Sequence, residues 1–231
     1  MNELVDRRIL AAFYCVDAIT GDVVTDPLSV GGAPWVIKQN RSGTYVIFDG
    51  PGFHAFTTDF TPANPPTTNA PVDITIQDPA LRYLPRRATL TAPSPLPMVP
   101  QTVTVYPAPS TPTGLNWAVV RVSVTQTVAG IAKGLPWAVV QLAGVTSPWS
   151  TASPTGMTYT NGEALLAVPG LKQSVSATIA AWFEPDTLNQ PPAWIPNPDE
   201  ILTNASTVKS APQPAQLGVG KVLTTSISIS V

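Results

Sequence analysis

The chain has 231 residues, enough for one large domain or two ordinary ones, and 44% of them are hydrophobic, which allows a substantial core. Only 11% are charged and the formal net charge is −2, so electrostatics give no basis for binding nucleic acid or an anionic membrane surface. The 27 prolines exceed the usual ~5% of residues. Together with the many apolar residues, they indicate a β-rich protein rather than a disordered chain.

The N-terminal stretch places acidic residues before a short apolar run, "ILAAFYCV", which argues against a cleaved secretory signal. No window approaches the ~18 uncharged apolar residues of a membrane span, so we expect synthesis in the cytoplasm. The run leads to a turn at Gly21 and predicts a strand. It contains Cys15, the one cysteine, which excludes an intrachain disulfide and which we expect to be buried and unreactive.

Further along the first half, "RSGTYVIFDGPGF" has a hairpin-type turn at Ser42-Gly43, an apolar strand and a Pro51-Gly52 corner. "VDITIQ" (72–77) alternates apolar and polar residues and predicts another strand. The segment "LRYLPRR" then carries the basic cluster of the chain: Arg82, Arg86 and Arg87. These arginines either contact an acidic partner or form a solvated strand edge that discourages aggregation, and both interpretations stay open.

A proline-rich stretch from Pro93 to Pro112 is the best linker candidate, because closely spaced prolines favour an extended, semi-rigid chain. We therefore predict a β-sandwich domain over residues 1–94, a linker over 95–112 and a second β-sandwich domain over 113–231. "QTVTVY" inside this linker is the exception, since it could still pair as an edge strand.

In the second half, "WAVVRVSVTQTV" (117–128), "SVSATIAAWF" (174–183) and "LTTSISISV" (223–231) all alternate with period two. The last strand, which ends at Val231, either completes its own sandwich or adds to a neighbour's sheet edge. "NPDEIL" predicts at most one short helix, with Asn197 as N-cap and Pro198 at the first helical position.

The two halves repeat one order of turns and strands. A strand leads to a glycine turn at Gly21 in the first half and at Gly130 in the second, and a strand, a hairpin turn and a Pro-Gly corner follow. "TNGEALLAVPGL" around Gly162 is the second copy of the stretch around Gly43. The copies share turn and core chemistry and differ elsewhere, which predicts an all-β fold of two tandem antiparallel sandwiches.

This pattern resembles the transthyretin-like or carboxypeptidase-regulatory-like β-sandwich, and it is similar to the collagen-adhesin B-type repeats. The resemblance covers about residues 8–90 and 117–183 and implies two such domains in tandem. Tandem modules of this type resemble accessory structural proteins of phage tails and of phage-tail-like contractile injection particles. By analogy, the resemblance implies a place in such a particle.

The residue types give little basis for an enzyme. His54 is the one histidine, so neither histidine catalysis nor a zinc site of clustered cysteines and histidines has support. Asp17, Asp22 and Asp26 surround the first turn, but their spacing differs from that of a calcium loop and favours turn capping. We expect no catalytic residue, no metal and no cofactor.

Of the six tryptophans, Trp35, Trp117, Trp137 and Trp182 lie at strand starts or within strands, and we expect them in the core. Trp149 and Trp194 lie in proline-rich loops and are candidate interface residues. The full set of candidate interface residues is Trp149, Trp194, Arg82, Arg86, Arg87 and Val231.

A free monomer with so few charges would tend to self-associate. We therefore expect a non-enzymatic structural or adaptor subunit that binds other protein subunits, in a phage-tail-like particle or a virion. Two alternatives stay open: a surface or carbohydrate-binding module that uses Trp149 and Trp194, and a regulatory β-module that escorts an enzyme.

Overall fold

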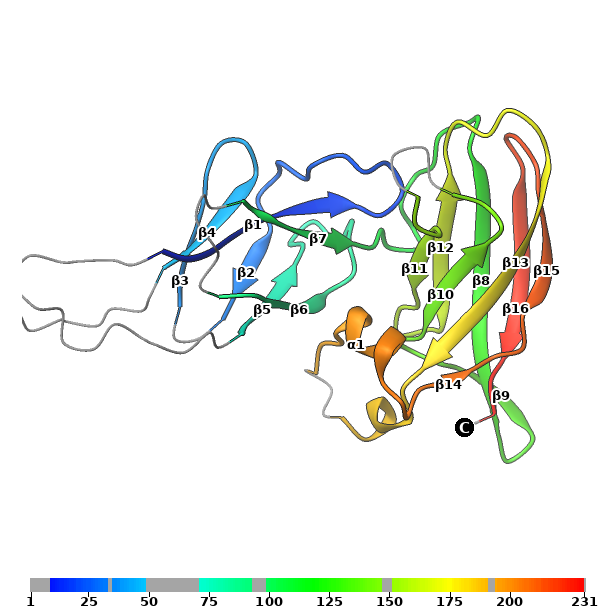
Figure 1. Ribbon diagram of the computed structural model, residues 1–231. Helices are drawn as coiled ribbons and strands as arrows, with labels where there is room; N and C mark the ends of the chain where they lie inside the picture. Colours follow the sequence, from blue (N-terminus) through cyan, green and yellow to red (C-terminus); the bar gives the residue numbers. More distant parts are fainter. Residues whose placement is uncertain are drawn as a thin grey trace, which may run out of the picture.

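The computed structural model describes residues 9–32, 35–48, 71–92, 99–146, 151–190 and 194–230. These residues form two β-sandwiches, one after the other along the chain (Figure 1). The predicted all-β class is confirmed. The Pro51-Gly52 corner and His54 lie outside the described residues.

The first sandwich has one four-stranded sheet, in the order β3-β4-β1-β7, and one three-stranded sheet, in the order β2-β5-β6. Strand β1 pairs antiparallel with β4 and parallel with β7. Its strands are β1 (Ile9–Asp17), β2 (Ser29–Gly31), β3 (Val36–Gln39), β4 (Thr44–Phe48), β5 (Val72–Gln77), β6 (Arg86–Leu90) and β7 (Gln101–Val105).

The second sandwich repeats this arrangement. Strand β8 pairs antiparallel with β12 and parallel with β16, while β13 pairs antiparallel with β10 and β15 in the opposite sheet. Its strands are β8 (Ala118–Val128), β9 (Ile131–Gly134), β10 (Val139–Ala143), β11 (Thr155–Met157), β12 (Glu163–Val168), β13 (Val175–Phe183), β14 (Val208–Lys209), β15 (Gln213–Leu217) and β16 (Val222–Ser228). The final strand therefore pairs within its own sandwich, one of the two options that the sequence left open.

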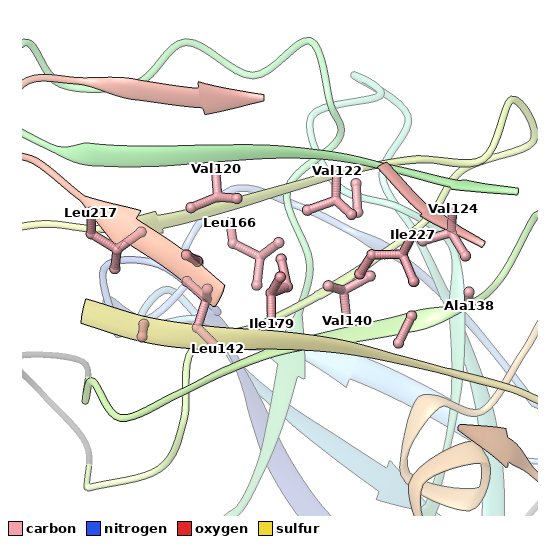
Figure 2. Packing of buried hydrophobic residues seen from close by; sticks show 14 of the residues in the cluster. Val120, Val122, Val124, Ala138, Val140, Leu142, Leu166, Ile179, Leu217 and Ile227 are labelled. Carbon is pink, nitrogen blue, oxygen red and sulfur yellow. The ribbon is translucent and has the colours of Figure 1, made fainter. Parts of the chain in front are cut away.

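Apolar side chains at alternate positions of the strands fill both cores. In the second sandwich, the buried side chains of β8 face those of β10 and β13, and Val122, Val140 and Ile179 lie between the two sheets (Figure 2). In the first sandwich, Phe13 of β1 and Ile74 of β5 belong to one buried cluster in the same way. Cys15 is buried in this cluster, and burial raises the pKa of its thiol to about 12, although Arg86 lowers it slightly, so the thiol stays protonated.

The predicted helix is α1 (Pro198–Thr203), which begins as expected. The Asn197 side chain accepts a hydrogen bond from the Asp199 N–H, and its amide donates to Glu200 Oε1 at 2.9 Å, so the cap side chain bonds to both the second and the third helical residue. A 3₁₀ turn, η1 (Pro185–Asn189), was not expected from the sequence.

The predicted linker differs from the structure. Strand β7 lies inside residues 95–112, pairs with β1 and buries Val103 and Val105 in the first core. The chain after β7 is also packed, because Tyr106 and Ala108 are buried in a cluster with residues of the second sandwich. Prolines on both sides of β7 mark the ends of an edge strand rather than an extended spacer.

The tryptophans expected in the core are half-buried instead. Trp35 packs against the first core, and the Trp182 ring lies 4.6 Å from the Lys209 ammonium. Trp117 and Trp137 pack against clusters that join the two sandwiches. The prediction that these four tryptophans lie in the core was therefore wrong, and for Trp117 and Trp137 the reason is that they contribute to the contact between the sandwiches.

Candidate functional site at the junction of the sandwiches

One end of the first sandwich packs against the flank of the second. The turn after β1 inserts Ile19, which is 3% exposed, against Val119 of β8 and against Leu165 and Ala167 of β12. These second-sandwich positions lie on the outer side of the sheet, opposite to the core face that holds Val120 and Leu166. Apolar residues on an otherwise polar strand face are therefore explained by the first sandwich that covers them.

A second apolar cluster extends this contact. Ala18, Leu84, Tyr106 and Ala108 come from the first sandwich and the chain that leaves it, whereas Met157 ends β11 and Trp137 precedes β10. All except the half-buried Trp137 are nearly inaccessible to solvent. Burial raises the pKa of Tyr106 to about 12, with Arg86 acting in the opposite direction, which keeps the phenol neutral in this contact.

Arg86 joins the two sandwiches through charged hydrogen bonds. Its guanidinium donates to the backbone carbonyls of Thr104 and Arg87 and, at 2.6 Å, to the carboxylate of Asp199 in α1. The Arg86 side chain is 1% exposed, while Asp199 is 68% exposed. The guanidinium is therefore neutralised at the rim of the contact while its other donors satisfy buried backbone carbonyls.

Arg87 contacts the segment before α1. Its backbone N–H donates to the Pro196 carbonyl at 2.6 Å, and its Nε donates to the Ile195 carbonyl at 2.9 Å. Its guanidinium lies 5.8 Å from the Trp194 ring centroid and 3.7 Å from the Glu200 carboxylate. Backbone and side chain thus hold one short segment of the second sandwich against β6.

Beside this contact lies an open groove of about 400 Å³. One wall comes from the first sandwich around Tyr83 and Pro109, and the other comes from the outer face of β8 and β12. Arg121 reaches across the groove and donates to the Pro109 carbonyl at 2.8 Å. The lining residues are Leu81, Tyr83, Leu84, Pro85, Ala108, Pro109, Ser110, Arg121, Tyr159, Asn161 and Glu163.

The groove lining has polar groups but no acid–base pair held for catalysis among the described residues. Burial raises the pKa of Tyr83, and the Asp17 carboxylate, which accepts a hydrogen bond from the Tyr83 hydroxyl at 3.0 Å, raises it further. Tyr83 is therefore a hydrogen-bond donor rather than a base. The groove can bind by contact and hydrogen bonding, and its walls belong to both sandwiches.

The structure brings together three of the six residues predicted to bind partners, namely Arg86, Arg87 and Trp194, and it uses them within the chain. Arg86 is buried, so it does not belong to a solvated strand edge, which was one of the two interpretations of the arginine cluster. Arg82 lies elsewhere: it pairs with Asp78 and Asp26 inside the first sandwich. Trp149 and Val231 lie outside the described residues.

Sequence reasoning missed the second wall of the junction, including Arg121, Tyr159 and Glu163. No local signal marks these residues, because Arg121 and Glu163 are polar at outward strand positions, as solvent-exposed residues are, and Tyr159 lies between two strands. Arg86 did carry a signal. In "RRATL" it shares the alternation of Ala88 and Leu90, which places it on the buried face of β6.

Among the described residues, no group of three or more histidine, cysteine, aspartate or glutamate side chains is placed to hold a metal ion. Within the same residues, neither helix is long and apolar enough to span a membrane.

No protein-family model matches the chain, and no curated protein matches it. Among solved structures, the minor pilin GBS52 of Streptococcus agalactiae is similar over 95% of each chain, at 8% identity and a TM-score of 0.33. The Bacillus anthracis TIE protein is similar over 96% of this chain and 34% of its own, at 8% identity and a TM-score of 0.27. Similarities this distant carry no argument about function.

Proposed function

We propose that this chain is a non-enzymatic structural or adaptor subunit of a larger protein assembly. The observation that carries the proposal is the junction between the sandwiches. A buried arginine, two apolar clusters and backbone hydrogen bonds join the two sandwiches. Such a junction favours a fixed spacing between the outer ends of the molecule, which a structural spacer requires and a flexible tether lacks.

The surface of the chain agrees with a subunit that other proteins cover. Only 11% of the residues are charged, and large apolar side chains are exposed in both sandwiches, among them Leu81 in the first and Ile131 in the second. Exposed apolar side chains on a surface with few charges favour association with protein partners.

Within this class we propose a phage-tail-like contractile injection particle or a virion as the assembly, with the chain made in the cytoplasm and incorporated into the particle. This finer proposal rests on the resemblance to tandem accessory domains of such particles. The carbohydrate-binding alternative uses Trp149 and Trp194. It has less support, because the ring of Trp194 packs on Arg87 in the junction.

Size-exclusion chromatography of native material, followed by negative-stain imaging, tests the proposal. We expect the 24.3 kDa chain to elute in a far larger particle of regular shape. A chain that is found only as a free monomer and that binds glycans would overturn the proposal in favour of the carbohydrate-binding alternative.

A further inference from the structure

The central strands β1 and β8 can be aligned, because each pairs antiparallel with one neighbour and parallel with the other. Cys15 of β1 pairs with Val103 of β7, and Val124 of β8 pairs with Ile227 of β16. Gly21 and Gly130, both with positive φ, follow Cys15 and Val124 at the same spacing. Cys15 is therefore the counterpart of Val124, and Ile19 and Val128 each lie four residues beyond it, although the connection back to the strand is two residues longer in the second sandwich.

Ile19 and Val128 have different surroundings. Ile19 is buried because the turn that carries it inserts into the second sandwich. Val128 lies at the tip of the β8–β9 hairpin, opposite Ile131 and next to the two-residue turn Ala129-Gly130. Both side chains are exposed, 39% for Val128 and 65% for Ile131. The second sandwich thus carries apolar side chains at the turn that corresponds to the docking turn after β1. In the second sandwich these side chains are exposed.

The receiving surface is also repeated. Ile19 docks on Val119, Leu165 and Ala167, of which Val119 and Ala167 form a cross-strand pair. In the first sandwich, Phe48 holds the place of Ala167 and pairs with Ile9, because the register of β1 shifts between Ile9 and Ala11. Val46 follows the turn glycine Gly43 as Leu165 follows Gly162.

Ile9, Val46 and Phe48 form what we call the β1–β4 outer face. Ile9 is 42% exposed, and Val46 and Phe48 are half-buried. The first sandwich therefore presents an apolar surface at the place where the second sandwich receives Ile19.

We propose that the β8–β9 hairpin of one copy docks on the β1–β4 outer face of a second copy, so that the contact within the chain is repeated between chains. This inference rests on the proposed function, since it names the partner of a structural subunit as another copy of the same chain. The docking turn and the receiving face lie on different sandwiches of one molecule. Such a contact is heterologous and joins copies head to tail.

The contact is small, because a hairpin tip offers few anchors, so we expect weak association that strengthens with concentration. Sedimentation velocity of the full chain over a concentration series measures it. We expect wild type to associate reversibly and Ile131→Asp to weaken association by about tenfold or more, because a buried aspartate would lose its hydration. Val222→Asp is the matched control: Val222 is 61% exposed in the same sandwich but away from the hairpin, and its substitution is expected to leave association unchanged.

Engineered disulfides give a second measurement that does not depend on how the aspartate variants fold. A mixture of Ile131→Cys and Val46→Cys proteins is expected to form a heterodimer on oxidation, whereas Ile131→Cys with Val222→Cys is not. The native Cys15 does not interfere, because it is buried and its thiol has a pKa of about 12. Equal crosslinking of both mixtures would overturn the proposed contact.

A wild-type chain that stays monomeric across the series and forms no selective crosslink would also overturn this contact. The proposed function would then still depend on whether native material elutes in a particle, so the two failures are distinguishable. Association that Ile131→Asp and Val222→Asp weaken equally would support self-association through another surface and would reject the hairpin.

Discussion

The two sandwiches share the pairing of their central strands but fill equivalent core positions with side chains of different size. Phe13 and Tyr45 stack in the first core with ring centroids 5.0 Å apart, and the Tyr45 hydroxyl accepts a hydrogen bond from the Leu28 N–H. Their counterparts in the second core are Val122 and Ala164, which belong to a cluster that is aliphatic except for Phe183. The fold is thus compatible with two different packings, provided that the turns and the strand register are kept.

The strand that precedes the turn glycine of each half, β3 before Gly43 and β11 before Gly162, shows where the strand pairing differs. Strand β3 pairs with β4, but its counterpart β11 pairs with β10 of the opposite sheet. A Cβ on Gly156 of β11 would lie 2.8 Å from the Leu165 carbonyl oxygen, so this glycine lets β11 pass close to β12. Short edge strands can change sheets because few backbone hydrogen bonds fix them.

Truncation of the aromatic stack is the strongest test of this comparison. Phe13→Ala removes a fully buried ring, and we expect it to lower the free energy of unfolding by about 4 kcal/mol. Val122→Ala at the equivalent position removes two carbons and is expected to cost about 2 kcal/mol. Guanidinium chloride unfolding measures both. Equal losses would show that the aromatic pair contributes no more than the aliphatic one.

The turn glycines give a graded series. Gly162 and Gly43 have φ of +81° and +82°, and a Cβ would lie 2.6 Å from the Val124 carbonyl oxygen at Gly162 but 2.9 Å from the Val24 carbonyl oxygen at Gly43. Gly130 has φ of +80° with no atom within 4 Å of an added Cβ. We expect alanine to cost about 3 kcal/mol at Gly162, less at Gly43, and at Gly130 only the ~1 kcal/mol of a left-handed backbone.

Thermal unfolding of the three glycine variants checks this order. Gly130→Ala is the internal control, since it has the same backbone strain without the close contact. If Gly130→Ala lowered the melting temperature as much as Gly162→Ala does, the positive φ alone, and not the close contact of an added Cβ, would explain why these turns need glycine.

Arg86 tests whether the sandwiches act as one body. Arg86→Met keeps most of the side-chain volume but leaves the Thr104 and Arg87 carbonyls without their guanidinium donor, which we expect to cost about 2 kcal/mol. Hydrogen exchange of the Arg87 N–H, which bonds to Pro196, is expected to accelerate because the junction opens more often. Arg82→Met is the control within the first sandwich and should leave that exchange rate unchanged.

The repeat could be predicted from the sequence because its signals are local. A turn glycine needs a positive φ, and the alternation after it puts every second residue on one face of the strand; Tyr45, Ile47, Ala164 and Leu166 lie on the buried face. The helix start at Asn197 is local as well. These features depend on residues at most a few positions apart.

The junction could not be predicted because it depends on residues far apart in the chain. Whether β7 pairs with β1 or spaces two domains depends on a partner about ninety residues away, and flanking prolines are compatible with both. The outer position of Leu165 is apolar only because Ile19 covers it. The continuous apolar run of β12 is consistent with burial of both its faces, but it does not say that the turn after β1 provides the cover.

The smallest expected effect concerns Asp78, the buried carboxylate that orients the turn before β6. It accepts hydrogen bonds from the Ala80 and Arg82 N–H groups and from the Arg82 guanidinium. Burial alone would raise the pKa of Asp78, but these hydrogen bonds outweigh it and lower the pKa below its ordinary value. The charged form is therefore the one that stabilises the first sandwich.

A lowered pKa in the folded state stabilises the protein fully above the unfolded pKa of about 3.9 and loses this effect as the pH falls through the folded value. We expect wild type to melt at a higher temperature than Asp78→Asn near neutral pH, and the gap to shrink below about pH 4. Glu163→Gln, at an exposed carboxylate of the second sandwich, is the control and should change little. If the difference in melting temperature between wild type and Asp78→Asn stayed constant as the pH fell, Asp78 would act through its shape rather than its charge. Asp78 would then give the first sandwich no more acid sensitivity than the second.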